Sequence, residues 1–327
     1  MEKKFLVVTS INPPTEAVRR LASMPDYQII MVGDKKTPLD WQEKNVTYLS
    51  PQVQESLPYS LLAHQPWNVP SRANIGYLYA LENGASLITQ VDDDNIPNEK
   101  WQIPLFQGSF ATLKHDGFIN IYRHFTDQFV WPRGLPLDKI LLPHTAVTTE
   151  SHHHVGVWQH LADNDTDVDA IYRLTNNTPV FFEQKRPVVL SVGTISPFNC
   201  QSTTFSQASA PLLYLPTCIS PRASDIVRGL IAQPILWKHD LALGFTSPIV
   251  HQQRNPHNNL HDFKDEILIY NYSEEIFNTA MTSLSKSHSM ADDLFSVYTA
   301  LCTKNIIPEK ELDSLTAWID DIQLITR

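Results

Sequence analysis

The stretch Ser86-Leu87-Ile88-Thr89-Gln90-Val91 is followed at once by Asp92-Asp93-Asp94-Asn95, and this pairing of a strand with an acidic turn is the strongest signal in the chain. Its first six residues form an apolar run typical of a buried strand, and three carboxylates follow at the carboxyl end of that strand. Adjacent carboxylates repel one another, and burying them without partners costs free energy. A divalent cation such as Mg²⁺ or Mn²⁺ removes that cost because it prefers oxygen ligands. We therefore expect a metal site here, although a solvated acidic turn would use the same residue types.

The segments before this strand predict an α/β sheet. Strands and helices alternate, with strands expected at 5–11, 27–32 and 46–49 and helices at 16–24 and 71–83. Thr15 can cap the first helix and Gly84 can end the second. The order predicts a mostly parallel, twisted, doubly wound sheet flanked by helices, which is the Rossmann-related class. Ligands of such sheets lie outside the carboxyl ends of the strands, where Asn12, Asp34 and the aspartates fall.

The second half of the chain gives different signals. The expected elements are strands at 117–122, from 167 onward and at 247–250, a helix fragment at 157–161, and helices at 224–236 and 273–327. The last region predicts a C-terminal helical extension. We therefore divide the chain into a domain at 1–268 and an extension at 269–327 that packs on it.

Composition limits the classes of function. Hydrophobic residues make up 42% of the 327 residues and charged residues 18%, as in a folded globular protein. The net charge of −10 argues against nucleic acid as a partner, but a local metal or arginine can still favour a nucleotide substrate. Cys200, Cys218 and Cys302 show neither zinc spacing nor a disulfide framework, which favours a reducing compartment. No stretch approaches the ~20 apolar residues of a membrane span. We expect a cytoplasmic protein without a transmembrane segment, and peripheral membrane association stays open.

Eight segments together resemble a known family. They are Thr9–Thr15, Val32–Pro38, Arg72–Ala80, Asp92–Asn95, Trp131–Leu137, Asp167–Leu174, Ser196–Gln201 and Arg222–Gly229. In this order they resemble the STELLO-type glycosyltransferases, known from plant Golgi proteins. They are more distantly similar to the reversibly glycosylated polypeptides, which are UDP-arabinopyranose mutases. The plant members carry an N-terminal membrane anchor, whereas this chain begins at its first expected strand, so we do not expect their Golgi location.

The resemblance implies a GT-A fold, a nucleotide-diphosphate sugar as donor and a divalent metal, Mn²⁺ or Mg²⁺. It implies a glycan, a glycolipid or another hydroxyl compound as acceptor, and a UDP-sugar is favoured as donor. Asp92 and Asp94 would hold the metal and the ribose, with Asp93 beside them or turned to the other side of the strand end. The resemblance also implies a late histidine as third metal ligand, for which we expect His251. His257 and His261 are nearby competitors.

The donor is expected to contact the strand ends and the start of the helix at 71–83. The expected residues are Thr9, Asn12, Asp34, Lys35, Arg72, Asn74, Asp92 and Asp93. Arg72 suits a diphosphate because its guanidinium can form paired hydrogen bonds with phosphate oxygens. Lys36 fits an exposed turn equally well, and Asn74 fits a helix cap.

Asp225 is the expected general base of an inverting transfer, in which a carboxylate removes the proton of the acceptor hydroxyl. Its position near the start of a helix allows another interpretation, an acid paired with Arg222 or Arg228. The loop with Trp131, Arg133 and Asp138 fits either a sugar-binding wall or core. The run His152-His153-His154 is interpreted as a polar stretch, since adjacent histidines point in different directions.

Two other functions stay open. A mutase or self-glycosylating protein would carry the sugar on an arginine, with Arg133 and Arg173 as possible positions. It would gain the mass of a sugar when incubated with nucleotide sugars. A non-catalytic scaffold of a polysaccharide synthase would bind the donor without turning it over.

Overall fold

The computed structural model describes residues 2–143, 146–176, 178–255 and 258–326. Within these residues a sheet of ten strands runs in the order β3-β2-β1-β4-β11-β8-β6-β9-β12-β5, and β8 also pairs with β12. The small strands β7 and β10 pair with each other. The strands are β1 (Lys4–Thr9), β2 (Tyr27–Val32), β3 (Val46–Leu49), β4 (Leu87–Val91), β5 (Asn95–Pro97), β6 (Gln107–Lys114), β7 (Gly117–Phe118), β8 (Val147–Asn164), β9 (Val188–Leu190), β10 (Thr194–Ile195), β11 (Ser202–Ser206) and β12 (Ala242–Gln252).

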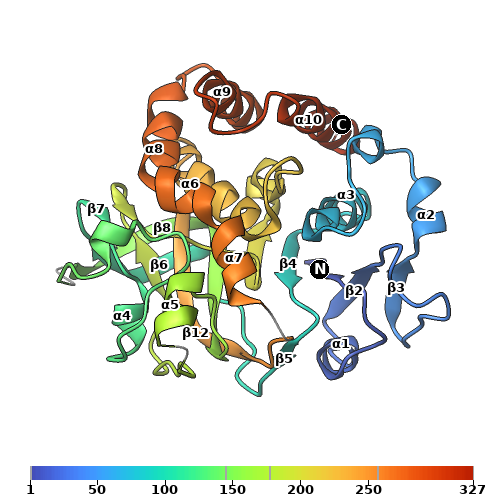
Figure 1. The fold of residues 1–327 in the computed structure, drawn as a ribbon, viewed down its shortest axis with the longest axis horizontal. Coiled ribbons are helices and arrows are strands. Elements are labelled where there is room, and N and C mark those ends of the chain that lie inside the picture. The colour runs from blue at the N-terminus through green and yellow to red at the C-terminus, as the bar shows by residue number, and fades with distance from the viewer. Residues whose placement is uncertain (1, 144–145, 177, 256–257, 327) are drawn as a thin grey trace.

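Helices cover the sheet (Figure 1). The α-helices are α1 (Glu16–Ala22), α2 (Pro51–Glu55), α3 (Ala73–Glu82), α4 (Tyr122–Phe125), α5 (Ala170–Thr175), α6 (Pro221–Lys238), α7 (Asn259–Asp265), α8 (Ile267–Ser283), α9 (Met290–Thr303) and α10 (Glu311–Ile325). The short 3-10 helices are η1 (Ser60–Ala63), η2 (Pro70–Arg72), η3 (Leu137–Lys139) and η4 (Gln207–Leu213). Every helix in the described ranges is too short or too polar to cross a lipid bilayer.

The N-terminal half of the sheet is parallel, as the sequence predicts. Strand β1 pairs in parallel with β2 and β4, and β2 pairs in parallel with β3. Side chains alternate between the two faces, so Val7 and Val32 pack toward α3 while Leu6 and Met31 pack toward α1. A Cβ atom at Gly76 would lie 2.6 Å from side-chain atoms of Val7 and Val32, so glycine is what lets α3 approach the sheet.

The second half of the sheet is mixed, which corrects the expectation of a mostly parallel sheet. Strand β11 runs antiparallel to both β4 and β8, whereas β12 runs parallel to β8. Strand β5 is antiparallel to β12 and joins it directly after the aspartates. The structure is therefore a mixed α/β fold with one large sheet, consistent with a GT-A-like arrangement.

Three sequence-based assignments in this half are wrong. The expected helix fragment at 157–161 lies inside β8, because the apolar run is buried in a central strand between β11 and β12. The strand expected from 167 is helix α5, whose N-cap Asp169 accepts a hydrogen bond from Tyr172 N at 2.8 Å. The strand expected at 117–122 stops after Phe118 and gives way to α4.

The helices near the C-terminus lie on the same side of the sheet as α3 and α6. Figure 1 shows α8, α9 and α10 arching over these two helices, and the helical character expected at 273–327 is confirmed. The division into a domain at 1–268 and a packed extension stays a prediction. One contact ties the two parts closely: Glu311, fully buried at the start of α10, accepts hydrogen bonds from Thr217 N at 2.9 Å and Cys218 N at 2.7 Å.

We expect Glu311→Ala to destabilise the protein by about 2 kcal/mol or more, because it leaves Thr217 N, Cys218 N and the Tyr214 hydroxyl without their acceptor. Equilibrium unfolding in urea measures the change. The matched control is Glu309→Ala, an exposed position two residues earlier, which should shift stability by less than about 0.5 kcal/mol. Equal effects of the two substitutions would show that the contact of Glu311 with Thr217 and Cys218 does not stabilise the protein.

Candidate functional site

Two adjoining pockets open at the carboxyl ends of β1, β2 and β4. The first, here called the β1–β2 pocket, has a volume of about 560 Å³ and includes Thr9, Asn12, Asp34 and Arg72 in its lining. The second, called the aspartate pocket, has a volume of about 330 Å³ and is lined by Asp92, Asp93 and Asp94, by Thr9, Pro70 and Arg133, and by residues of the second half of the chain. Thr9, Pro70 and Asp93 line both pockets, so the two pockets share a wall.

Asp93 organises the end of β1. Its carboxylate accepts hydrogen bonds from the Ser10 hydroxyl and from Asn12 Nδ2, the latter at 3.0 Å. Its backbone carbonyl accepts a hydrogen bond from the Thr15 hydroxyl, which also caps α1 as the sequence predicts. Asp93 therefore fixes the turn between β1 and α1, and it presents a carboxylate edge to both pockets.

Asp92 and Asp94 are buried carboxylates whose negative charge the surrounding residues do not fully compensate. Burial, followed by the charges of Asp94 and Asp93, raises the pKa of Asp92 well above its usual value. Within the described part of the chain, the Asp92 side chain has no hydrogen-bond or ion-pair partner. Burial also raises the pKa of Asp94, against the opposing effect of a hydrogen bond from Gln252 Nε2 at 3.1 Å. A positive charge between these two carboxylates would relieve both effects.

The donor atoms fit a hard divalent cation that is shared with a substrate. The described residues contain no group of three or more His, Cys, Asp or Glu side chains placed to hold a metal by themselves. Mg²⁺-type sites commonly use one or two carboxylates and fill the remaining positions with water and substrate phosphate oxygens. Asp92 and Asp94 match that pattern.

The structure does not bring His251 to these carboxylates. Adjacent residues of a strand point to opposite faces, and it is Gln252 of β12 that reaches Asp94. His251 lies across from Asp163 in β8 and influences that carboxylate instead. Of its competitors, His261 pairs with Asp265 on α7 at 3.4 Å, and His257 lies outside the described residues.

The β1–β2 pocket brings together five of the expected donor-binding residues, and its walls are held by hydrogen bonds. Asp34 is buried, and its carboxylate accepts from Asn68 N and Lys35 N, both at 2.7 Å. The Lys35 ammonium lies 5.0 Å from the centre of the Trp67 ring, and Lys36 is exposed. These contacts fix the turn after β2 against the 65–70 segment.

Arg72 lines the β1–β2 pocket but uses most of its N–H groups internally. Its Nε and Nη2 donate to Gln54 Oε1 at 2.9 and 2.6 Å, and its Nη1 donates to the carbonyl oxygens of Gln65 and Pro66. The guanidinium stacks on the Trp67 ring at 3.4 Å, and burial lowers the pKa of Arg72 to about 10. Arg72 therefore holds the pocket wall, whereas the sequence predicted a direct phosphate contact.

Asn74 is fully buried away from both pockets. Its side chain accepts from Leu215 N at 2.8 Å and donates to the Leu215 carbonyl at 2.9 Å, which ties α3 to the chain ahead of α6. It neither lines the donor site nor caps the helix, because η2 precedes α3 without a break and leaves Arg72 as the N-cap.

Asp225 forms part of a buried ion group with Arg133 and Asp167. Arg133 donates to both oxygens of Asp225 at 2.9 Å and to both oxygens of Asp167 at 2.8 Å. Burial alone would raise the pKa of Asp225, but the charge and hydrogen bonds of Arg133 hold it below its usual value. Cys200 N donates to the same carboxylate at 3.2 Å. This environment favours the ion-pair interpretation of Asp225 over that of a free base, and the partner is Arg133 rather than Arg222 or Arg228.

The aromatic loop is core rather than sugar-binding wall. Trp131 is buried and donates from Nε1 to Asp169 at 2.7 Å, while Asp138 is exposed and pairs with Lys139. The three histidines at 152–154 lie in β8 opposite β6.

Sequence reasoning missed several residues of the aspartate pocket as site residues. They are Asp167, Gln201, Arg222, Gln252 and Arg254. Arg173 also lines the pocket, although the sequence suggested it only as a possible carrier of the sugar. Each comes from the second half of the chain, and no local motif marks them as part of one site.

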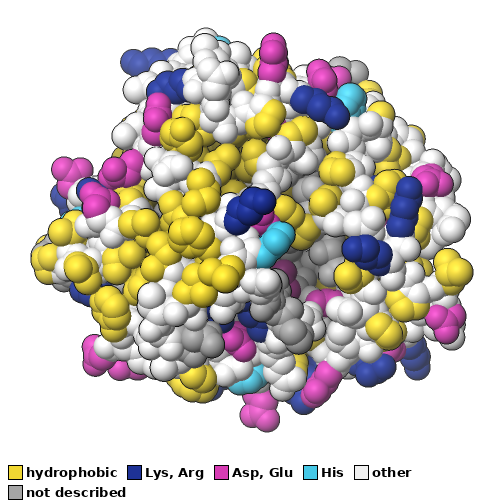
Figure 2. Space-filling model, in the orientation of Figure 1, with side chains coloured by type: hydrophobic (Ala, Val, Ile, Leu, Met, Phe, Trp, Pro, Cys, Tyr) yellow, Lys and Arg dark blue, Asp and Glu magenta, His cyan; other side chains and the backbone are white. Residues whose placement is uncertain are grey.

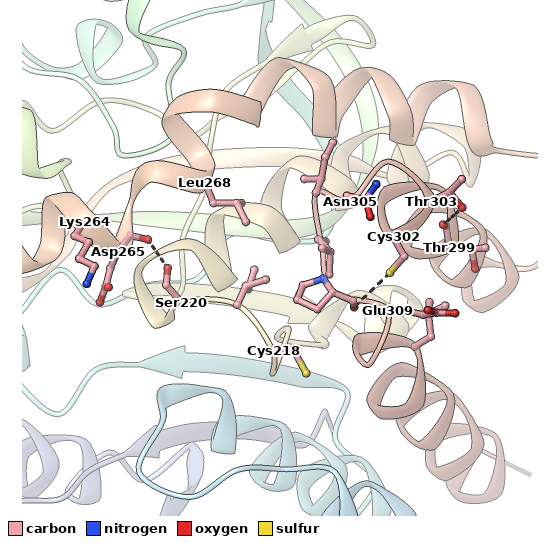
Figure 3. A pocket seen from close by; sticks show the side chains of 15 residues that line it. Cys218, Ser220, Lys264, Asp265, Leu268, Thr299, Cys302, Thr303, Asn305 and Glu309 are labelled. Carbon is pink, nitrogen blue, oxygen red and sulfur yellow. Dashed lines mark hydrogen bonds between the residues drawn. The ribbon is translucent and has the colours of Figure 1, made fainter.

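A third pocket of about 730 Å³ lies near the C-terminal helices (Figure 3). It is larger than the other two, and Figure 3 shows Leu268 and Cys302 directed into it from α8 and α9. None of the expected site residues lines it. Size alone does not outweigh the carboxylates, so we place the site at the strand ends.

Comparisons with known proteins identify a similar family. The family model described as STELLO glycosyltransferases matches residues 222–326. The chain is 26% identical over 346 residues to the probable glycosyltransferase STELLO2 of Arabidopsis thaliana, which covers 99% of this chain. The chain is similar to the STELLO glycosyltransferases. The probable glycosyltransferase STELLO1 of the same plant is also 26% identical, over 98% of this chain.

The STELLO resemblance inferred from the sequence is thereby confirmed. The chain spans less than half the length of these two relatives, 45% of STELLO2 and 44% of STELLO1. The family match begins at Arg222 and contains Asp225, Arg254 and the helices α8 to α10. Most of the region that the sequence suggested as an extension is therefore part of what the STELLO family shares.

Proposed function

We propose that the chain is a metal-dependent glycosyltransferase that takes its sugar from a nucleotide-diphosphate sugar, with a UDP-sugar favoured. The observation that carries the proposal is the pair Asp92 and Asp94, two carboxylates of raised pKa at a strand end, which line the aspartate pocket beside the β1–β2 pocket. The names of the two Arabidopsis relatives support the reaction class.

The roles of the residues follow from their positions. The nucleoside would occupy the β1–β2 pocket, with Thr9, Asn12 and Asp34 among the groups that line it. Its diphosphate would extend toward the aspartate pocket, where Asp92 and Asp94 would hold Mn²⁺ or Mg²⁺. When bound there, the cation would supply positive charge to the departing nucleoside diphosphate.

We keep the inverting outcome as part of the proposal but change the role of Asp225. A carboxylate whose pKa is held down by Arg133 is a weak base, since proton transfer is efficient when the pKa lies near the working pH. Asp225 and Asp167 instead hold Arg133 between α6 and the chain ahead of α5. The same contacts make Arg133 a poor carrier of a sugar, which weakens the self-glycosylation alternative.

A thermal-shift panel of UDP, GDP and CMP, each with and without Mn²⁺, tests the donor site. We expect UDP with Mn²⁺ to stabilise the protein by about 2.7 kcal/mol at 100 times its Kd, because a ligand that binds only the folded state stabilises it by mass action. Asp94→Ala should abolish the metal-dependent part of the shift. Asp40→Asn, an exposed aspartate in the turn after β2, is the control and should keep it. If no nucleotide shifts the transition with or without Mn²⁺, the proposed function is wrong.

A further inference from the structure

Besides Arg133, three arginines line the aspartate pocket, all from the second half of the chain. Arg173 comes from α5, Arg222 from the first turn of α6, and Arg254 from the segment after β12. None of them lines the β1–β2 pocket. If the donor nucleotide occupies the β1–β2 pocket, these arginines lie on the side where the acceptor must enter.

Arg173 has hydrogen-bonding capacity to spare. Its side chain is 8% exposed, and it pairs with Asp165 at 3.1 Å and donates to the Thr166 carbonyl at 2.9 Å. Its Nε is buried without a hydrogen-bond partner among the described residues. A buried, unpaired N–H on a charged group is costly unless a ligand accepts from it.

The other two arginines are also incompletely paired. Arg254 donates only from Nη2, to Asp262 at 2.7 Å, within the part of the chain that the structure describes. Arg222 binds Glu266 through Nε and Nη2, and Nη2 also donates to the Val168 carbonyl at 3.3 Å, while its Nη1 lies 4.0 Å from Asp167. Each of the two guanidinium groups is thus oriented by at least one carboxylate and keeps N–H groups for another acceptor.

The start of α6 adds to this positive end of the pocket. The helix has 18 residues, its first residue Pro221 lines the pocket, and its N-cap Ser220 makes no side-chain capping bond. The N-terminus of a helix of this length favours anions because the helix dipole places partial positive charge there. Together with the charges of Arg173, Arg222 and Arg254, it makes this wall suited to a compact anion.

None of the described carboxylates that line the pocket is left as a free base. Asp225 and Asp167 are committed to Arg133, Asp93 accepts hydrogen bonds from Ser10 and Asn12, and Asp92 and Asp94 are assigned to the cation in the proposed function. A hydroxyl acceptor needs a base to take its proton, whereas a phosphomonoester does not, because its second pKa of about 6 leaves the oxygen ionised at neutral pH.

We propose that the acceptor of this transferase is a phosphomonoester, held by Arg173, Arg222 and Arg254. This inference rests on the proposed function. A lone pair of a phosphate oxygen forms the new bond to the anomeric carbon, and the bond from that carbon to the donor diphosphate breaks. The bonding electrons leave with the nucleoside diphosphate. The product is a glycosyl phosphodiester, and no proton is transferred.

The surface beside the arginines suggests where the rest of a phosphorylated acceptor could lie. Leu260 and Phe263 on α7, Ile267 on α8 and Leu174 on α5 are 36–69% exposed. Figure 2 shows hydrophobic side chains gathered on the part of the face where Figure 1 places α5, α7 and α8. Asp262, the partner of Arg254, lies between Leu260 and Phe263 on α7. A lipid chain on the phosphate would cover this apolar surface.

Matched acceptor pairs test the proposal and identify the source of the phosphate. The lipid arm compares farnesyl phosphate with farnesol, and the soluble arm compares glucose 6-phosphate with glucose, with the UDP-sugar as donor. We expect the phosphorylated member of at least one pair to react with a kcat/KM about 10-fold higher or more. A preference in the lipid arm assigns the apolar surface to the acceptor, and one in the soluble arm alone assigns a water-soluble phosphate ester. Equal or faster reaction of the alcohol in both arms overturns the proposal.

Variants test the arginines separately. Arg173→Gln and Arg254→Gln should each raise the KM for the phosphorylated acceptor about 10-fold or more, since each loses charge-assisted hydrogen bonds, while the KM for the donor stays unchanged. Arg20→Gln, an exposed residue paired with Glu16, is the control. Farnesyl phosphate should also raise the unfolding temperature of the UDP–Mn²⁺ complex of the wild type but not of Arg173→Gln. Donor hydrolysis and the UDP shift report on the proposed function itself, so its failure is distinguishable from failure of this inference.

Discussion

The Asp92→Asn protein should be more stable than the wild type and inactive as a transferase. Asn keeps the shape of the side chain but removes the charge that burial and the neighbouring Asp94 and Asp93 disfavour. We expect a gain of about 1 kcal/mol or more in the free energy of unfolding at neutral pH. We also expect kcat/KM to fall about 1,000-fold or more, because the proposed cation would lose one of its two protein ligands.

The pH dependence of this gain has a definite sign. The pKa of Asp92 is raised in the folded protein, so the wild type loses stability as pH rises from the unfolded-state pKa, near 4, toward the folded-state pKa. The difference between Asp92→Asn and the wild type should therefore be small below about pH 4 and grow above it. Urea unfolding from pH 3.5 to 8 measures it. If Asp92→Asn destabilises the protein at neutral pH, the charge of Asp92 is not unfavourable in the folded state. If the variant retains transfer, Asp92 is not a ligand of the cation.

Arg133→Met should cause the largest loss of stability of any substitution considered. It leaves Asp167 and Asp225 buried, 8% and 4% exposed, without their shared cation. Removing one partner of a buried ion group costs about 3–5 kcal/mol. Asp225 has a lowered pKa in the folded state, so its contribution is present above the unfolded-state pKa, near 4, and is lost as pH falls through the lowered value. The cost of Arg133→Met should therefore shrink on acidification.

A compensated variant separates loss of charge balance from loss of packing. Arg133→Met combined with Asp167→Asn and Asp225→Asn removes all three charges and should recover part of the lost stability. Arg186→Met is the matched control, because Arg186 pairs with Glu150 on the surface and should contribute less than about 1 kcal/mol. If Arg133→Met and Arg186→Met have similar unfolding midpoints in urea, the ion group is not what holds α6 in place.

Sequence patterns predicted the N-terminal half of the fold because each element there carries a local signal. The strands at 27–32 and 46–49 match β2 and β3, and Thr15 caps α1. Predictions for the second half were wrong where tertiary contacts override the local secondary-structure preference of the sequence. The run at 157–161 became part of an 18-residue strand because it is paired on both sides, and Asp169 caps a helix that has only six residues.

The residues of the candidate site also fall into a group that the sequence predicted and a group that it did not. Asp34 and the three aspartates could be placed at one edge because strand ends of a parallel sheet meet there. The environment of Asp225 depends on Arg133, which lies 92 positions earlier, and Arg254 approaches the pocket only because β12 pairs with β8. Because side chains alternate between the two faces of β12, Gln252 contacts Asp94 in place of the expected His251. Such contacts depend on the assembled second half of the sheet, for which the sequence carried no local marker.

The contacts of α10 also bear on how the protein folds during its synthesis. Asp321 accepts hydrogen bonds from Ser60 N at 2.8 Å and Leu61 N at 2.9 Å, 261 and 260 positions earlier, and Glu311 holds the chain just ahead of α6. The contact of Glu311 cannot form until residue 311 has left the ribosome, and that of Asp321 not until residue 321 has. Until then, the apolar surface on which α8 to α10 dock stays exposed in the nascent chain. We therefore expect a chaperone to bind the unfinished chain during synthesis.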